Sequence, residues 1–432
     1  MTDSDVIAPM APAVPGTLDP GSTSRTGTLE PGGDPRKRVA VFLGTRPEGI
    51  KLAPVITALE GTGELEPMVV TTGQHREMLD QVIELFGIDV DHDLDVMQPD
   101  QTLASLTARL ITRVDQLLEE TRPDMAVVQG DTTTVLMAAL ACFYRRVPIA
   151  HVEAGLRTGS LMSPFPEEAN RRLAAPLIAL HFAPTTLARE NLLKEGVRED
   201  AITVTGNTVI DALFMEVARQ RAPEIRARID AQLSEVVGAD WADVPYVLVT
   251  GHRRENFGAG FAHICDALRR LAERFPDHRL IYPVHLNPNV QGTVYERVGG
   301  LANVRLIPPQ EYRLFVALMQ HSRLLLTDSG GVQEEAPSLG KPVLVMRDTT
   351  ERPEGVAAGT VKLVGANADR IVDEVSRLLT DADAYRAMAA AKNPYGDGHA
   401  AERVALRILQ HCRAELDDEE TSYKVAASAP DP

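Results

Sequence analysis

The stretch RLLLTDSGGVQEEAPSLGKPVLVMR, residues 323–347, predicts a strand, a Gly-Gly turn, a short helix and a second strand. Residues 324–327 and 343–346 are continuous apolar runs, which are typical of parallel strands buried on both faces. A strand, a helix and a strand in this order form a right-handed crossover between parallel strands. The stretch therefore predicts an α/β fold.

The turn inside this stretch is a candidate phosphate site. Ser329, Gly330 and Gly331 bring backbone N–H groups to the start of the helix, where unpaired donors and the helix dipole favour an anion. Glu334 and Glu335 follow one turn later. Because helical side chains lean toward the N-terminus, a carboxylate here can reach a ribose whose phosphates lie on the turn. The alternative is an ordinary turn in which the glutamates only complement the helix dipole.

Size and composition limit the class of protein. The 432 residues are too many for one ordinary core and predict two domains, and the 44% of hydrophobic residues is enough to fill two cores of that size. The formal net charge of −17 argues against nucleic acid and against an anionic membrane surface as partners. No membrane span or secretion signal is recognisable, and the three scattered cysteines suit a reducing compartment. We therefore expect a cytoplasmic protein.

Short apolar segments alternate with amphipathic ones in two series, which predicts two Rossmann-like domains with parallel sheets. Strands are predicted at residues 39–43, 68–72, 125–129, 148–152 and 202–205, and then at 246–250, 280–284, 304–307, 324–327, 343–346 and 361–364.

The domain boundaries follow from these series. We expect an N-terminal domain over 36–208, a C-terminal domain over 209–397 and a last helix over 398–416 that packs back on the N-terminal domain. The leader, 1–35, is rich in Pro and Gly, and the tail, 417–432, is acidic and then rich in Ala, Ser and Pro. Both compositions predict disorder.

Polar clusters follow several predicted strands, and ligands of open α/β sheets bind at the carboxyl ends of strands. Arg46 and Lys51 follow the first strand as two cations that can face an anion. Asp131 and Glu153 follow the third and fourth strands, and a carboxylate after a buried strand is costly unless it is paired or used. His252 follows the first strand of the second series, where a histidine can protonate a leaving phosphate oxygen. Structural alternatives stay open, because Asp131 is also a good helix N-cap.

Several cofactor and nucleophile motifs are missing from the sequence. It has no GxGxxG dinucleotide fingerprint, no GxxxxGK[ST] loop, no GxSxG elbow and no paired metal-binding histidines. We therefore expect no cofactor and no metal.

A series of motifs in the correct order resembles the non-hydrolysing UDP-N-acetylglucosamine 2-epimerases over about residues 38–412. The motifs are GTRPEGIK, GQHREMLD, QGDTTT, HVEAGLRTG, SPFPEEANRR, TGNTVIDAL, TGHRREN, YPVHLNPNV, LTDSGGVQEEAPSLGKPVLVMRDTTERPE and NPYGDG. The resemblance implies a glycosyltransferase-B-type fold with two sheets facing a cleft, a homodimer, and conversion of UDP-GlcNAc to UDP-ManNAc for cell-surface polysaccharides. Gly49 stands where the family usually has Ala, and we expect only a helix-propensity cost of about 1 kcal/mol or less.

The resemblance also implies roles for individual residues. The catalytic set is Asp131, Glu153, Glu167 and His252. Ser329, Gly330, Gly331 and Glu335 are expected to hold the diphosphate and ribose, with further substrate contacts from Arg46, Lys51, Asp131, Glu153, His252, Gln310, Phe315 and Arg352. Gln74, His75 and Arg76 are candidates for a second, activating UDP-GlcNAc site.

The chemistry explains why such a site needs several carboxylates. Carbon 2 of a sugar nucleotide has no adjacent carbonyl, so its proton is lost only if UDP leaves carbon 1 at the same time. This elimination gives 2-acetamidoglucal, and re-addition with a proton on the other face inverts carbon 2. Two faces require two proton-handling groups, and Asp131, Glu153 and Glu167 supply three candidates.

Three rival functions remain open from the sequence. A hydrolysing epimerase would release UDP and free ManNAc, a glycosyltransferase of the same fold would need an acceptor, and a nucleotide-sugar sensor would bind without turnover. The motifs EAGLRTG and PFPEEANR argue against a transferase, and the carboxylates argue against a sensor.

Overall fold

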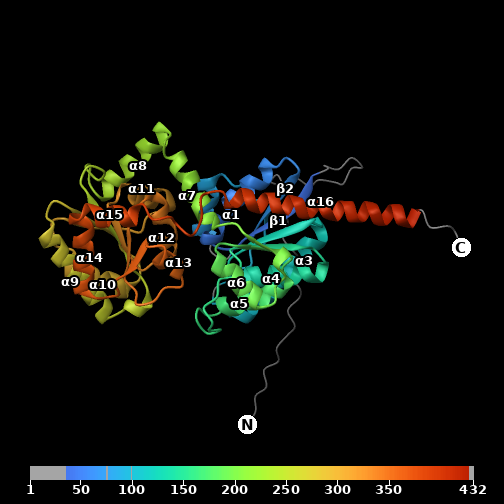
Figure 1. The fold of residues 1–432 in the computed structure, drawn as a ribbon, viewed down its shortest axis with the longest axis horizontal. Helices are drawn as coiled ribbons and strands as arrows, with labels where there is room; N and C mark the ends of the chain where they lie inside the picture. The colour runs from blue at the N-terminus through green and yellow to red at the C-terminus, as the bar shows by residue number, and fades with distance from the viewer. Residues whose placement is uncertain (1–35, 74–75, 99, 428–432) are drawn as a thin grey trace, which may run out of the picture. The chain divides into compact units, whose positions relative to one another are not determined.

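The structure, a computed structural model, describes residues 36–73, 76–98 and 100–427. Two sheets organise these residues, with strand orders β3-β2-β1-β4-β5-β6-β7 and β10-β9-β8-β11-β12-β13 (Figure 1). Neighbouring strands pair in parallel in both sheets. The predicted α/β fold with two Rossmann-like domains, the glycosyltransferase-B type, is confirmed.

The first sheet contains two strands that the sequence did not predict. Its strands are β1 (Lys37–Leu43), β2 (Leu65–Thr71), β3 (His92–Asp93), β4 (Met125–Gln129), β5 (Ile149–Val152), β6 (Leu180–Ala183) and β7 (Ile202–Val204). The strand β3 is only two polar residues long, and β6 is four residues long with a histidine inside it, so neither produces a separate apolar run. The second sheet, with β8 (Tyr246–Thr250), β9 (Arg279–Pro283), β10 (Val304–Ile307), β11 (Leu324–Thr327), β12 (Val343–Val345) and β13 (Val361–Leu363), has the six predicted strands.

Helices cover both faces of each sheet. Those of the first half are α1 (Arg46–Gly61), α2 (Arg76–Phe86), α3 (Leu103–Thr121), α4 (Thr133–Arg145), α5 (Glu167–Ala174) and α6 (Thr186–Lys194). The others are α7 (Thr208–Arg219), α8 (Pro223–Val236), α9 (Ala259–Arg274), α10 (Pro288–Val298), α11 (Tyr312–His321), α12 (Gly330–Glu335), α13 (Pro353–Ala357), α14 (Ala368–Thr380), α15 (Ala382–Ala389) and α16 (Ala400–Ala427). Among these helices none is long and apolar enough to cross a membrane.

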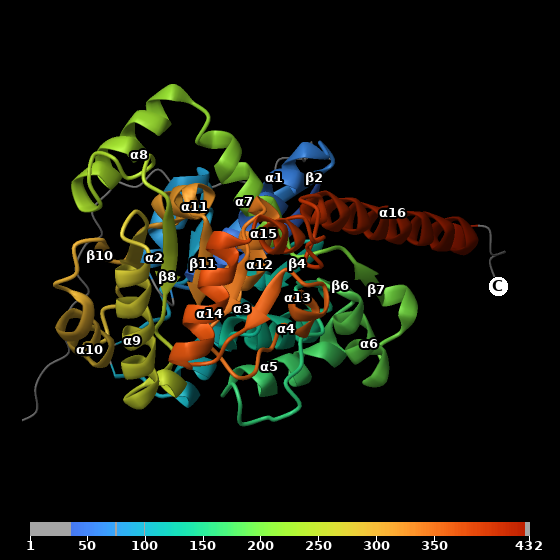
Figure 2. The ribbon, with the colours of Figure 1, turned by 60° about the vertical axis from the view of Figure 1, so that its left-hand side comes forward.

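The alternation of side chains along each strand builds separate layers. In β1, Val39 and Val41 pack with α1 and α7, whereas Ala40 and Phe42 pack on the other face with α3 and α4. In the second sheet, one face packs against α9, α10 and α14 and the other against α11 and α12 (Figure 2). Burial on both faces explains why these strands are continuous apolar runs.

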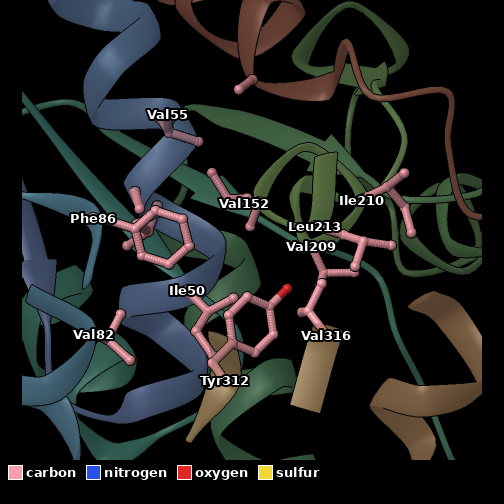
Figure 3. Packing of buried hydrophobic residues seen from close by; sticks show 14 of the residues in the cluster. Ile50, Val55, Val82, Phe86, Val152, Val209, Ile210, Leu213, Tyr312 and Val316 are labelled. Carbon is pink, nitrogen blue, oxygen red and sulfur yellow. The ribbon is translucent and has the colours of Figure 1, made fainter. Parts of the chain in front are cut away.

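One hydrophobic cluster joins the two halves of the described chain. It includes Ile50 of α1, Phe86 of α2, Val209 of α7 and Tyr312 of α11, which pack around one another (Figure 3). The ends of α1, α7 and α11 are therefore held together by a shared core. This core fixes the relative positions of α1, α7 and α11.

Gly49, which stands where the resembling family usually has Ala, has a packing role that helix propensity alone does not predict. A Cβ built on Gly49 would lie 2.8 Å from Leu79 Cδ1 and 3.1 Å from Val82 Cγ1, both on α2. The glycine therefore lets α1 and α2 approach closely.

The last helix is longer than the sequence predicted. The helix α16 packs against α1 and α7 through Val404 and Ile408 and continues to Ala427. The disorder predicted for the tail from residue 417 stays a prediction. Residues 417–427 contain no Pro or Gly, so nothing in this segment breaks a helix that has already formed. The predicted disordered leader, 1–35, and the end of the tail, 428–432, lie outside the described residues.

Candidate active site

A cavity of about 500 Å³ lies between the carboxyl ends of the two sheets. The strand order reverses between β1 and β4 and between β8 and β11, and open α/β sheets bind their ligands at such points. The predicted site residues that line the cavity are Arg46, Lys51, His252, Gln310, Phe315, Ser329, Gly331, Glu335 and Arg352. The structure therefore brings residues from both halves of the sequence to one place.

A larger hollow of about 970 Å³ lies elsewhere, near the amino-terminal end of β6 and the side of α16. It is lined by none of the site candidates that the structure describes. We therefore take the smaller cavity as the candidate active site.

The Ser-Gly-Gly turn forms one wall of the cavity. Ser329 is the N-cap residue of α12, and its N–H donates to Thr327 Oγ1 at 2.9 Å. A Cβ built on Gly330 would lie 2.9 Å from the guanidinium carbon of Arg352. Glycine at this position therefore leaves the space in which Arg352 lies against the turn, although Gly330 itself does not line the cavity.

Arg352 is held beside the turn by a carboxylate. Its Nε donates to Glu334 Oε1 at 2.6 Å, and Glu334 is buried on α12. Although burial works against the charged guanidinium, Glu334 and Glu153 raise the pKa of Arg352 above its ordinary value. A guanidinium that stays charged therefore faces the cavity beside the backbone of the Ser-Gly-Gly turn. This arrangement suits a diphosphate.

Glu153 lies behind Lys51 and is bound on every side. Lys51 Nζ donates to Glu153 Oε1 at 2.6 Å and to Oε2 at 2.7 Å, and the side-chain amides of Gln129 and Asn207 donate to the same carboxylate. Burial raises the pKa of Glu153, but the Lys51 ammonium and the other donors outweigh it, so the pKa falls below its ordinary value. Glu153 is therefore an ionised carboxylate at neutral pH.

The backbone at Glu153 is strained. Its φ is +64°, a left-handed conformation that a residue with a Cβ adopts rarely and at a cost of about 1 kcal/mol or more. The strain turns the side chain at the end of β5 toward Lys51. Strain of this kind is common at functional sites.

Glu335 is a second buried carboxylate in the cavity wall. Its Oε1 accepts a hydrogen bond of 2.7 Å from the hydroxyl of Tyr312 on α11. Burial and the neighbouring charge of Glu334 raise the pKa of Glu335 to about 7. A carboxylate that is easily neutralised can exchange its Tyr312 partner for a ligand hydroxyl at low cost.

His252 is oriented by a buried aspartate. Its Nδ1 lies 3.2 Å from Asp328 Oδ1, and the backbone N–H groups of His252 and Arg253 each donate to Asp328 Oδ2 at 2.9 Å. The ring of His252 also stacks on that of His285, with centroids 5.5 Å apart. Because Asp328 occupies Nδ1, Nε2 is the ring nitrogen that remains for a ligand.

Asp131 and Glu167, like Glu153, do not line the cavity. Asp131 accepts hydrogen bonds of 3.0 and 2.6 Å from Arg171 Nε and Nη2. Glu167 begins α5 and is half-buried, while its neighbour Glu168 is fully buried and accepts from Thr158 N and Arg171 Nη1. The structure therefore places Asp131 at the end of β4, beside the strand that carries Glu153, and shows that Glu168 holds the loop after β5.

Glu48 is a buried carboxylate that the sequence analysis missed. It accepts hydrogen bonds from Gly44 N at 2.5 Å, Thr45 N at 2.7 Å and Thr132 Oγ1 at 2.6 Å, so it ties the loop after β1 to the loop after β4. Burial raises its pKa to about 7 although these three donors oppose the rise. The spacing Thr45-x-x-Glu48, a capping box, is the signal that predicts its position.

The predicted activating site lies mostly outside the described residues. Gln74, His75 and the side chain of Arg76 lie outside what the structure describes, and the backbone of Arg76 begins α2. The activating site stays a prediction.

The chain matches a known family and its members over most of its length. Residues 57–409 match the family model described as UDP-N-acetylglucosamine 2-epimerase. The UDP-N-acetylglucosamine 2-epimerases of Yersinia pestis and Escherichia coli K12 are 54% and 53% identical to it. These alignments cover 87% and 88% of this chain and 99% and 100% of the relatives.

Solved structures of the same family share the fold. The UDP-GlcNAc 2-epimerase from Neisseria meningitidis, bound to UDP-GlcNAc, is 47% identical with a TM-score of 0.79 and covers 87% of this chain and 100% of its own. The enzyme from Methanocaldococcus jannaschii, in complex with UDP-GlcNAc and UDP, is 34% identical with a TM-score of 0.71 and covers 87% and 99%. The chain is an isomerase that belongs to the UDP-N-acetylglucosamine 2-epimerase family.

Proposed function

We propose that this enzyme interconverts UDP-GlcNAc and UDP-ManNAc without hydrolysis, by eliminating UDP and adding it back, and that the product supplies polysaccharide synthesis. The observation that carries the proposal is the ionised Glu153, which is bonded to Lys51 directly behind the cavity wall. Lys51 itself lines the cavity together with Arg352, Ser329 and Gly331. A base next to an anion site is what a coupled loss of a proton and a diphosphate needs.

The first half-reaction removes the elements of UDP from the sugar. A carboxylate takes the proton from carbon 2, the C–H electron pair forms a double bond to carbon 1, and the bond from carbon 1 to the diphosphate oxygen breaks. The electron pair of that bond leaves with UDP, which Arg352 and the backbone of Ser329 and Gly331 stabilise. His252 donates a proton to the departing oxygen through Nε2.

The second half-reaction reverses these steps with one difference. A second proton-handling group, Asp131 or Glu167, delivers a proton to the opposite face of carbon 2, and UDP adds back to carbon 1. Because the cavity lies between two domains, their closure around the ligand would keep water from the 2-acetamidoglucal intermediate.

Proton NMR of the enzyme with UDP-GlcNAc in D₂O tests the proposal. We expect UDP-ManNAc with deuterium at carbon 2 and no free sugar. Free ManNAc together with UDP would instead identify a hydrolysing epimerase. Binding without any exchange at carbon 2 would identify a sensor and refute the proposed function.

Gly330→Ala is expected to weaken UDP binding by roughly tenfold or more, because the new methyl group occupies the place of the Arg352 guanidinium and breaks its bond to Glu334. Titration calorimetry with UDP measures the effect. Gly292→Ala on α10 is the matched control, since a Cβ there meets no atom within 4 Å. Equal UDP affinities of Gly330→Ala and the control would show that Arg352 does not bind the nucleotide.

We also propose that the enzyme is a homodimer that pairs through α4 and α5. Phe143 and Tyr144 on α4 are 58% and 64% exposed, and Leu173 on α5 is 61% exposed. The two helices pack against each other, so these large apolar side chains lie on neighbouring elements. Sedimentation velocity of the wild type and of Tyr144→Glu tests this, with a dimer expected for the first and a monomer for the second. A monomeric wild type would refute the pairing.

A further inference from the structure

Asn207 stands where the chain leaves the first sheet. It is the N-cap residue of α7, between the end of β7 at Val204 and the first residue of α7 at Thr208, and it is 2% exposed. The motif TGNTVIDAL contains it, but neither the fold nor the proposed reaction has so far given it a role.

The orientation of the Asn207 amide is fixed by its own helix. Its Oδ1 accepts a hydrogen bond of 3.1 Å from Val209 N, which places Nδ2 on the side away from the helix. The two hydrogens of Nδ2 then meet two carboxylates, Glu153 Oε1 at 3.0 Å and Glu334 Oε2 at 3.3 Å. One amide therefore bridges a carboxylate of the first sheet and a carboxylate of the second half.

A second motif clamps Asn207 from the other side. Tyr395 O accepts a hydrogen bond of 2.6 Å from Asn207 N, and Asn393 Nδ2 donates to the backbone oxygen of Glu334 at 2.8 Å. A Cβ built on Gly396 would lie 3.4 Å from Asn207 N, at a φ of +147°. The motif NPYGDG, residues 393–398, thus holds both Asn207 and the helix that carries Glu334.

We propose that Asn207 is a positioning residue, whose side-chain amide orients the carboxylate of Glu153 for proton transfer and couples it to the Glu334–Arg352 pair at the diphosphate site. The proposal rests on the proposed function, in which Glu153 handles the carbon-2 proton. Lys51 contacts both oxygens of Glu153, so on its own it would let the carboxylate follow the flexible lysine chain. Asn207, together with Gln129, keeps the two oxygens in place.

The charged groups around Glu153 predict how the loss of this amide changes the pH profile. They are Lys51 on α1, Arg352 before α13, Glu334 on α12 and His151 on β5. Asn207 donates to the ionised form of Glu153, so its removal raises the pKa of that carboxyl. The acidic limb of the kcat profile is therefore expected to move to higher pH.

Asn207→Ser tests the proposal, because serine is a good N-cap and keeps α7 but cannot reach the two carboxylates. We expect kcat to fall roughly 10- to 100-fold with little change in KM, together with the shift of the acidic limb. Asn367→Ser is the matched control: Asn367 caps α14 through Arg370 N in the same way, and none of its described contacts reaches a carboxylate. The control is expected to keep the wild-type kcat and pH profile.

Unchanged kcat in Asn207→Ser, or a loss of kcat with an unchanged acidic limb, would overturn the positioning role. If the serine variant does not fold, Asn207→Thr takes its place, because threonine is also an N-cap residue and has no amide donor. If the wild type itself does not epimerise, the proposed function fails, and a crystal structure of the serine variant decides the positioning role separately. A Glu153 carboxylate that stays in its place there would overturn it, and a displaced one would support it.

Discussion

Glu153→Gln is expected to lower turnover by at least ~100-fold while UDP still binds. The substitution keeps the size of the side chain but removes the charge that takes the proton. Glutamine also cannot neutralise Lys51, so a buried ammonium is left without its anionic partner and its pKa falls. Part of the expected loss therefore comes from the lost partner of Lys51, which lines the cavity beside Arg352.

The rate of UDP-ManNAc formation and the rate of deuterium incorporation at carbon 2 measure this effect together. Glu216→Gln on α7 is the matched control, because Glu216 is also buried and paired with a cation, Arg313 at 3.2 Å. Neither Arg313 nor Gln220, its described partners, lines the cavity, whereas Lys51, the partner of Glu153, does. We expect the control to keep the wild-type turnover even if it unfolds at a lower temperature. Turnover of Glu153→Gln within a few-fold of the wild type would remove Glu153 from the catalytic set.

The two sheets were predictable from the sequence because their strands are buried on both faces. Burial of this kind requires continuous apolar runs such as residues 324–327, which can be recognised without knowing the neighbours of the strand. The strand β6 was not recognised in this way, since its four residues include His181 and begin only two residues after a helical turn. The length of α16 was not predictable in the same way, because residues 417–427 have an acidic composition but contain no helix breaker.

The site was predictable where function requires a polar residue at the end of a strand. Arg46, His252 and Ser329 follow strands directly, and chain topology alone brings them to the cavity. The partners of these residues were not predictable in the same way. Asn207 and Glu334 meet across 127 positions of sequence, and only the packed arrangement of α7 and α12 shows that they touch.

The sequence also could not separate the two glutamates of the PFPEE motif. Both lie in the first turn of α5, where the negative charge of either side chain complements the helix dipole. The structure separates them, because Glu168 is fully buried against Arg171 and the loop of Thr158, whereas Glu167 is half-buried. Glu168 is therefore fixed by its partners, and Glu167 is the one left for the proton-handling role carried over from the family.

Asp131→Asn is expected to lower epimerisation by at least ~100-fold, for the same reason of lost proton transfer but on the other face of the sugar. Arg171 donates both of its hydrogen bonds to Asp131 Oδ2, so an asparagine whose amide oxygen takes that place can keep both bonds and loses only the charge. Asp115→Asn is the control, since Asp115 also accepts two hydrogen bonds from one arginine, Arg145, at 2.6 Å each, but lies within α3 and not at the carboxyl end of a strand.

Isotope exchange then distinguishes the two faces. If Glu153 and Asp131 serve opposite faces, each variant loses epimerisation but still exchanges the carbon-2 proton of one epimer, and the two variants exchange different epimers. This follows because the intact group can remove and return a proton on its own face while UDP leaves and adds back. Exchange of the same epimer by both variants would place the two carboxylates on one face, and normal epimerisation by Asp131→Asn would give the second role to Glu167.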